Sequence, residues 1–155
     1  MKYTLTILLA ILLLAFNAGC SSRSVGSNVM KTEPGEDRLV HSYCYQYLYG
    51  SIAHAVNYGK AFHWCQLGLE RKISASQVLL AEMYFLGLHV DQDYLMAHDV
   101  YLLAAHQGHA HAQWMLYQMY VRGLGVELTP SIAQEWLTKA SSNGHEGAKK
   151  QMKNL

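Results

Sequence analysis

Histidine and cysteine side chains give this chain its main opportunities for chemistry at neutral pH. The sequence contains nine histidines and three cysteines. His106, His109 and His111 fall close together, and this spacing could supply imidazole ligands to a metal ion. No acidic residue or thiol stands nearby in the sequence to complete the ligand set. We therefore predict no metal site and no cofactor, and we interpret these histidines, with His63 and His98, as surface side chains.

Sequence signatures of catalysis are missing. The glycines form no phosphate-binding loop, no serine sits in a nucleophile elbow, and no pair of carboxylates suggests acid–base catalysis. A Cys–His nucleophilic site built on Cys44 or Cys65 is the remaining alternative. Both cysteines, however, align with repeat positions that Leu80 and Tyr101 fill in the next unit. We predict that the chain is not an enzyme.

The first part of the chain has the pattern of an export signal. Lys2 precedes an apolar run from Leu5 to Phe16, and the small residues Ala18 and Gly19 follow it. The run is too short for a membrane-spanning helix, which needs about 20 apolar residues. We predict a cleaved signal peptide over residues 1–19.

The segment from Asn17 to Cys20 resembles the lipobox of bacterial lipoproteins. That resemblance implies that Cys20 becomes the lipidated first residue of the mature chain. Asn17 stands where the lipobox usually has leucine, so an ordinary signal with a coincidental cysteine remains the alternative. Ser21 is not the aspartate that marks inner-membrane retention, which favours the periplasmic face of the outer membrane.

Composition places the rest of the chain in one folded domain behind a polar tether. Serine, glycine and asparagine dominate the stretch after Cys20, so we assign residues 20–37 to a flexible tether and residues 38–155 to the domain. The net charge of +1, with lysine and arginine scattered, gives no electrostatic support for nucleic-acid binding.

Internal repetition organises this domain. When the sequence is slid against itself by 36 positions, like residues superpose along its whole length. The coincidences include Ala61, Ala97 and Ala133; Gly68, Ala104 and Ala140; Trp64, Val100 and Trp136; and the pairs Leu80/Leu116, Met83/Met119, Tyr84/Tyr120, Gly87/Gly123 and Gly108/Gly144. So many matches at one offset predict stacked structural units.

The pattern of each unit predicts two helices, with glycines at the helix ends. The first helix is expected over Ala75 to Leu86 and over His111 to Arg122, where like residues recur every four positions. A glycine ends each of these helices because it adopts a left-handed conformation without steric cost. The second helices are expected to begin after the N-caps Asp93 and Thr129 and to end at Gly108 and Gly144.

An incomplete unit is expected at each end of the array. Alternating tyrosines from Tyr43 to Tyr49 could suggest a strand. The repeat register instead places Val40, Cys44 and Leu48 on first-helix positions, with a partner helix over Tyr58 to Glu70. A final half-unit over His145 to Lys153 brings the expectation to about seven helices.

The loop and helix motifs of these units resemble a known family. The run Tyr120-Val121-Arg122-Gly123-Leu124-Gly125-Val126, followed by Ala133, Trp136 and Gly144, is similar to the Sel-one-like repeat, a 36-residue relative of the tetratricopeptide repeat. The resemblance covers roughly residues 58 to 152. It implies an all-α solenoid of stacked antiparallel hairpins whose concave face holds partner proteins, often in cell envelopes.

Candidate partner-binding residues lie on the first helices, which would line that concave face. We expect solvent-facing polar side chains with nearby aromatic anchors there, and aromatic residues are favoured at interaction hot spots. The candidates are Tyr45, Gln46, Tyr49, Gln77, Glu82, Phe85, Gln113 and Gln118. The alternative is that each aromatic side chain merely packs between repeats.

The sequence thus suggests a lipid-anchored envelope protein whose partner is another protein. We expect an adaptor or scaffold in an envelope complex. The alternative is an immunity protein that neutralises a toxic periplasmic effector such as a secreted lipase, a use to which small lipoproteins of this repeat family are put. The sequence does not separate these two roles.

Cys44 and Cys65 are predicted to form a disulfide. They occupy core-like positions on the two helices of the opening hairpin, and an oxidising compartment favours pairing of the two cysteines that remain after Cys20 is lipidated. The alternative is that both are small buried apolar residues with free thiols.

Overall fold

A computed structural model describes residues 34–154, and every regular element among them is an α-helix. The predicted signal peptide and Cys20 lie outside the described residues. The seven helices are α2 (Pro34–Tyr49), α3 (Tyr58–Glu70), α4 (Ser74–Leu86), α5 (Tyr94–His106), α6 (Ala110–Arg122), α7 (Pro130–Ser142) and α8 (Glu146–Lys153). None of these helices is long and apolar enough to cross a membrane.

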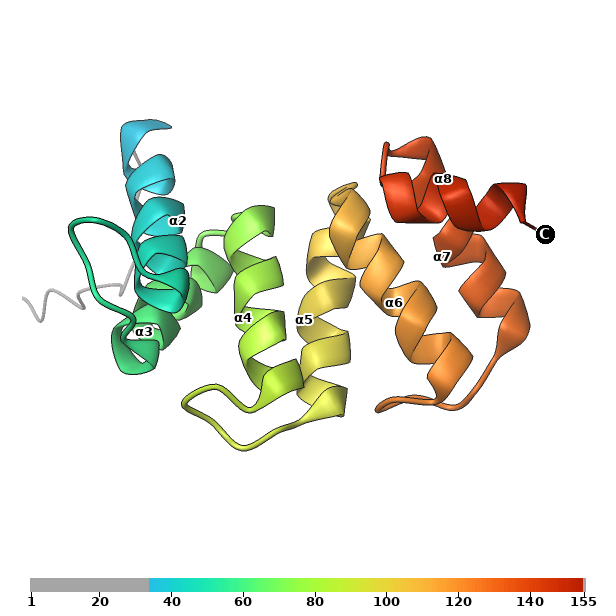
Figure 1. Cartoon of the computed structure of the whole chain (residues 1–155), viewed down its shortest axis with the longest axis horizontal. Helices are drawn as coiled ribbons and strands as arrows, with labels where there is room; N and C mark the ends of the chain where they lie inside the picture. The colour runs from blue at the N-terminus through green and yellow to red at the C-terminus, as the bar shows by residue number, and fades with distance from the viewer. Residues whose placement is uncertain (1–33, 155) are drawn as a thin grey trace, which may run out of the picture. The chain divides into compact units, whose positions relative to one another are not determined.

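The helices form stacked hairpins (Figure 1). Helices α2 and α3, α4 and α5, and α6 and α7 pair within hairpins, while α3 packs on α4, α5 on α6, and α7 on α8. Helix α2 also contacts α4 directly, so the first helices of neighbouring repeats meet. The predicted all-α solenoid with a final half-unit is confirmed.

The first helices of the second and third hairpins end at the predicted glycines. Gly87 and Gly123 end α4 and α6 with φ values of 70° and 66°, in the left-handed region. The Asp93 side chain caps α5 by accepting a hydrogen bond from the Met96 amide at 2.9 Å. Thr129 differs, because its hydroxyl donates to the Glu127 carbonyl and leaves the N-terminus of α7 without a side-chain cap.

One loop position shows why glycine is required in one repeat and dispensable in another. A Cβ on Gly125 would lie 2.5 Å from the carbonyl carbon of Tyr94, so only glycine fits that close approach. The equivalent residue one repeat earlier is His89, which also has a positive φ of 71°. Its imidazole ring packs 5.5 Å from the ring of Phe62, a contact that glycine would not make.

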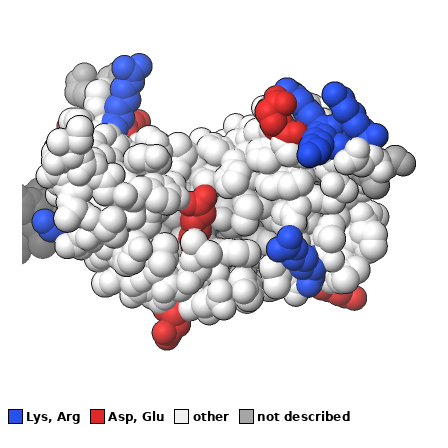
Figure 2. Space-filling model, viewed as in Figure 1, with Lys and Arg blue, Asp and Glu red and all other residues white. Residues whose placement is uncertain are grey.

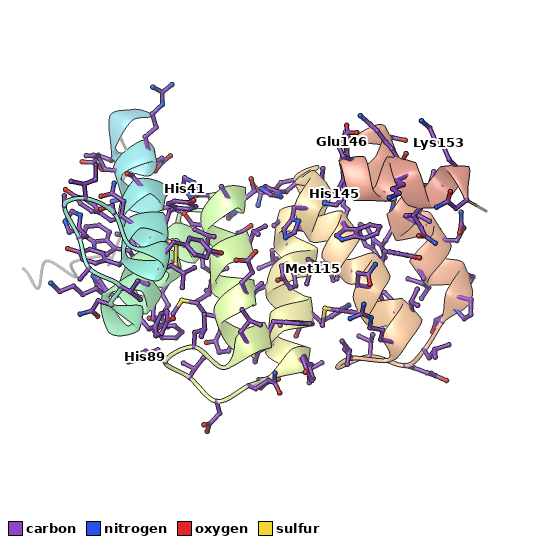
Figure 3. The ribbon with its side chains drawn as sticks, viewed as in Figure 1. His41, His89, Met115, His145, Glu146 and Lys153 are labelled. Atoms are coloured by element: carbon purple, nitrogen blue, oxygen red, sulfur yellow. A yellow bond between two sulfur atoms is a disulfide. The ribbon has the colours of Figure 1, made fainter. Side chains whose placement is uncertain are left out.

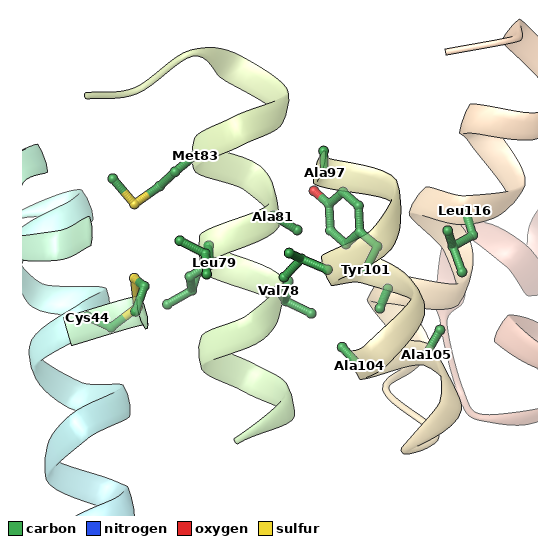
Figure 4. Close-up of a cluster of buried hydrophobic side chains, with 14 of the residues drawn as sticks. Cys44, Val78, Leu79, Ala81, Met83, Ala97, Tyr101, Ala104, Ala105 and Leu116 are labelled. Atoms are coloured by element: carbon green, nitrogen blue, oxygen red, sulfur yellow. A yellow bond between two sulfur atoms is a disulfide. The ribbon is translucent and has the colours of Figure 1, made fainter. Parts of the chain in front are cut away.

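A continuous apolar core joins the repeats. It runs from Cys44 on α2 through Leu80 and Tyr101 to Leu116, and it includes Trp136 on α7. Figure 4 shows its central part between α2 and α6. A smaller cluster of Leu137, Ala140 and Ala148 closes the C-terminal end.

Small residues set how closely successive hairpins approach. Gly68 on α3 is buried, and a Cβ placed on it would collide with the Cβ of Ser76 on α4. The equivalent positions carry Ala104 with Ala112 and Ala140 with Ala148, and all four alanines are fully buried. At the first junction, Gly68 on α3 therefore makes room for Ser76 on α4, which is larger than the alanine at the equivalent positions.

The observed boundaries differ slightly from the expected ones. Helix α2 begins at Pro34, so the first helix extends into the segment assigned to the tether. Pro34 suits the first turn of a helix, where its missing N–H costs no hydrogen bond. Helices α4 and α6 each begin one residue before the predicted start, whereas α8 begins at Glu146 with His145 as its N-cap.

Candidate interaction surface

Side chains from the first helices of successive repeats touch across the repeat boundaries. The Tyr49 hydroxyl on α2 donates to Oε2 of Glu82 on α4 at 2.5 Å. Oε1 of Glu82 lies 3.4 Å from Nε2 of His111 on α6. The other ring nitrogen of His111 lies 3.4 Å from Nε2 of His145, the N-cap of α8. We call Tyr49, Glu82, His111 and His145 the cross-repeat row.

The backbone of α8 determines which ring nitrogen carries the proton in each neutral histidine of the row. The Ala148 amide donates to Nδ1 of His145 at 3.2 Å, so the ring proton of a neutral His145 sits on Nε2. That proton is directed at Nδ1 of His111, which leaves the His111 proton on Nε2. The protonated edge of His111 therefore faces the Glu82 carboxylate.

Burial keeps the histidines around this row uncharged near neutral pH. It lowers the pKa of His41, and it lowers the pKa of His145, which the neighbouring charge of His111 depresses further. The pKa of His109 is lowered by burial and then by the charges of His111 and His41. Burial and the bond to Glu82 raise the pKa of Tyr49 far above its usual value.

These shifts predict a loss of stability in mild acid. The three lowered histidine pKa values mean that the unfolded chain takes up protons before the folded chain does. Their contribution to folding is therefore complete above the ordinary histidine pKa of about 6.5 and is lost as the pH falls toward the folded-state values. We expect the free energy of unfolding to drop between pH 7.5 and pH 5.5 in urea titrations followed by circular dichroism.

His145→Asn provides the control for this pH dependence. Asparagine keeps a capping oxygen for α8 but does not titrate in this range. The variant should show a shallower decline in stability toward acid than the wild type. A free energy of unfolding that is constant or rises between pH 7.5 and pH 5.5 would contradict the assignment.

Aromatic rings lie at both ends of the row. Tyr45 and Tyr49 on α2 are 50% and 52% exposed, and their ring centroids are 4.9 Å apart. At the other end, the indole of Trp114 stacks on His145 at 5.0 Å. In Figure 3, His41 and His145 lie toward one edge of the stack and His89 toward the opposite edge.

The face of the stack seen in Figure 2 carries few charged side chains over its middle. Figure 2 shows a largely uncharged face, with basic side chains gathered over α8. Helix α8 carries Lys149, Lys150 and Lys153, and Lys149 pairs with Glu146 at 2.8 Å.

The predicted binding residues divide into accessible and structural ones. Tyr45 and Tyr49 are exposed, as expected, and Glu82 joins the cross-repeat row. Gln46, Phe85 and Gln118 are half-buried. Gln46 is held by hydrogen bonds with Ser42 and His54, and the Phe85 ring packs 5.1 Å from Tyr94. Phe85 is therefore a packing residue, but this contact lies within its own hairpin rather than between repeats as the alternative had it.

The prediction that Gln77 and Gln113 face solvent is wrong, because only 2% and 3% of their surface is exposed. Each amide binds the C-terminal end of the second helix in its own hairpin. Gln107 donates to Gln77 at 2.7 Å, and Asn143 donates to Gln113 at 2.9 Å. Gln113 also donates to the Ala105 carbonyl. These two glutamines satisfy helix ends and are not available to a partner.

The histidines that were predicted to be surface side chains lie in different environments. His106 lies 5.8 Å from the Trp136 ring, His109 is half-buried, and His111 belongs to the cross-repeat row. Among residues 34–154, no group of three or more histidine, cysteine or acidic side chains is placed to hold a metal ion. His63 is exposed, but His98 is 8% exposed and contacts Asp99 and Tyr120, so its assignment to the surface is wrong.

His145 and Trp114 were not among the predicted site residues. His145 stands 36 positions after His109, and both are helix N-caps, so the repeat register contained a signal for His145. Trp114 aligns with the buried Val78, which disguised its contact with His145.

The repeat architecture identifies the family. The Sel1 repeat matches three segments of the chain, residues 41–72, 74–109 and 110–145. The chain belongs to the Sel1 repeat family. These boundaries follow the three hairpins of the structure, α2–α3, α4–α5 and α6–α7. Sel1 repeat proteins are generally interaction modules without catalytic activity.

Solved Sel1-type structures share this fold. A Sel1 repeat protein from Oxalobacter formigenes is 30% identical, with a TM-score of 0.70 over 78% of this chain and 90% of that one. A protective antigen of uropathogenic Escherichia coli that displays an SLR fold is 25% identical, with a TM-score of 0.71 over 76% of this chain and 25% of the antigen. Cysteine rich protein B of Helicobacter pylori, 19% identical, has a TM-score of 0.63 over 73% of this chain and 89% of its own. None of the curated proteins matches the sequence.

Proposed function

We propose that this protein is a lipid-anchored adaptor that holds another protein at the periplasmic face of the outer membrane. The observation that carries the proposal is the cross-repeat row, which links four first-helix segments and begins at the half-exposed Tyr49, beside the half-exposed Tyr45. Stacked repeats present such a surface to an extended partner, and tyrosine contributes large contact area at interfaces.

Site-specific photo-crosslinking in cells tests this function. A photoreactive amino acid at Tyr45 should capture a protein partner, which mass spectrometry then identifies. The matched control places the same amino acid at Leu95, which is 58% exposed but belongs to the second helix of its hairpin. Capture at neither position, or equal capture at both, would contradict binding through the first helices. Capture of a secreted toxic effector at Tyr45 would replace the adaptor role with immunity.

The anchoring part of the proposal rests on the resemblance of the Asn17–Cys20 segment to a lipobox. Cys20→Ser removes the only residue of that segment that can be acylated, so the variant should accumulate as a soluble periplasmic protein or an uncleaved precursor. Metabolic labelling with a fatty-acid analogue and membrane fractionation measure the change. A wild-type chain that takes up no label would disprove lipidation.

A further inference from the structure

We propose that the cross-repeat row, together with Tyr45, binds a cationic side chain, arginine or lysine, on an extended segment of the partner protein. This inference rests on the proposed function and adds the chemistry that the surface recognises.

The charge of the row is the first argument. Glu82 is its only carboxylate, and only 20% of that side chain is exposed. A carboxylate this far from solvent is stabilised by a nearby cation, and an unpaired one is costly. Within the described residues, no lysine or arginine lies within ion-pair distance of Glu82, and the one ion-pair neighbour is His111, an imidazole. His41, His109 and His145 are neutral at neutral pH, so they do not balance the negative charge of Glu82.

Three other acidic side chains have lysine or arginine partners within the described residues, and the remaining ones, unlike Glu82, are exposed to solvent. Arg71 pairs with Glu36 and Asp37 at 3.3 Å and 3.6 Å, and Lys149 pairs with Glu146. Glu82 differs from them because its contacts are a phenol and an imidazole. This difference favours a cation supplied by the partner.

The aromatic rings beside Glu82 are the second argument. Tyr49 holds one carboxylate oxygen through its hydroxyl, while about half of its surface and half of Tyr45 remain open to solvent. Faces of exposed aromatic rings attract ammonium and guanidinium groups. The Glu82 carboxylate, bound by Tyr49, whose ring lies 4.9 Å from that of Tyr45, therefore offers an ion pair and a cation–π contact to one side chain.

A buried tyrosine hydroxyl of the core is the third polar group to consider. The hydroxyl of Tyr101 on α5 is buried and has no hydrogen-bond partner among the described residues. Burial raises the pKa of Tyr101, and the negative charge of Glu82 adds to that rise. An acidic partner would be repelled here, and an apolar one would bury Glu82 further without a counter-charge.

Nuclear magnetic resonance titration of the purified protein tests the inference. The probe is a short capped peptide with one arginine between glycines and serines, and the control peptide carries citrulline, the neutral isostere of arginine. The arginine peptide should cause saturable shifts at Tyr45, Tyr49, Glu82 and His111. The citrulline peptide should bind about tenfold more weakly, a difference of about 1.4 kcal/mol in binding free energy.

Two variants make the test specific. Glu82→Gln removes the charge but keeps an oxygen that can accept from Tyr49, so it should fold normally and lose about tenfold in affinity for the arginine peptide. Glu135→Gln removes an exposed charge from α7 and should change nothing. Equal binding of the two peptides, or full affinity in Glu82→Gln, would overturn the inference.

The same variants separate this inference from the proposed function. If the photo-crosslinker at Tyr45 captures a partner equally well in the Glu82→Gln background, the interaction role stands and cation recognition is rejected. If Glu82→Gln abolishes that capture while its circular dichroism and melting temperature match the wild type, both are supported.

Discussion

Replacing Trp136 with alanine should lower the free energy of unfolding by about 3–5 kcal/mol. Trp136 is 6% exposed and belongs to the main apolar core, although it lies on the last full hairpin. Its ring lies 5.8 Å from that of His106 on α5, and the Lys139 ammonium sits 4.3 Å above it. Removing the ring therefore opens a cavity between the second and third hairpins and also ends a cation–π contact.

The damage should be confined at first to the C-terminal hairpin. A repeat array is held by contacts between neighbours, so a weakened interface lets the outer units unfold before the rest. Hydrogen exchange followed by mass spectrometry should show faster exchange in α6–α8 than in α2–α4. Trp64→Ala is the control, because Trp64 holds the equivalent position but is half-buried, and its effect should be smaller and N-terminal. A Trp136→Ala melt that matches the wild type would contradict burial of the ring.

Loss of the Cys44–Cys65 disulfide should cost about 3 kcal/mol of stability in the chain-entropy model. The structure joins these two residues, and their Cα atoms are 5.0 Å apart across 21 positions of sequence. Both are fully buried between α2 and α3. The crosslink limits the freedom of the unfolded chain in the first hairpin, which no earlier repeat covers within the described residues.

Thiol counting and denaturation test the disulfide. Protein purified from the periplasm and denatured without reductant should show no titratable thiol at these two positions, and reductant should lower its melting temperature. The Cys44→Ala/Cys65→Ala variant should melt at the lower temperature with or without reductant. Two reactive thiols in the unreduced wild type would rule out the bond.

The repeat period was readable because each unit reuses the same small, large and turn residues. Gly87 and Gly123 end equivalent helices, and the predicted helix over Tyr58 to Glu70 matches α3 at both ends. Burial was harder to predict. In a stack, a first helix is covered by its own partner helix and by both neighbours, so polar residues such as Gln77 and Gln113 can bind buried helix ends.

The cross-repeat row was hidden from the repeat alignment for a geometric reason. Tyr49 and Glu82 are 33 positions apart, and His111 and His145 are 34 apart, so neither pair follows the 36-residue period. The row crosses the stack diagonally, from the last turn of α2 to the N-cap of α8. Comparison of equivalent positions therefore cannot reveal which unlike residues meet.

The glycine on α3 bears on how this array could lengthen by duplication. A second copy of residues 110–145 inserted after the first would set Ala140 against another Ala112, a pairing of alanines already present at two junctions. A second copy of residues 74–109 would set Ala104 against another Ser76, where the tight junction at Gly68 has no Cβ on the facing helix. New units can therefore be added by copying the last full repeat. At the first junction, Ser76 fits only against Gly68, so the repeat that carries Ser76 cannot be copied in the same way.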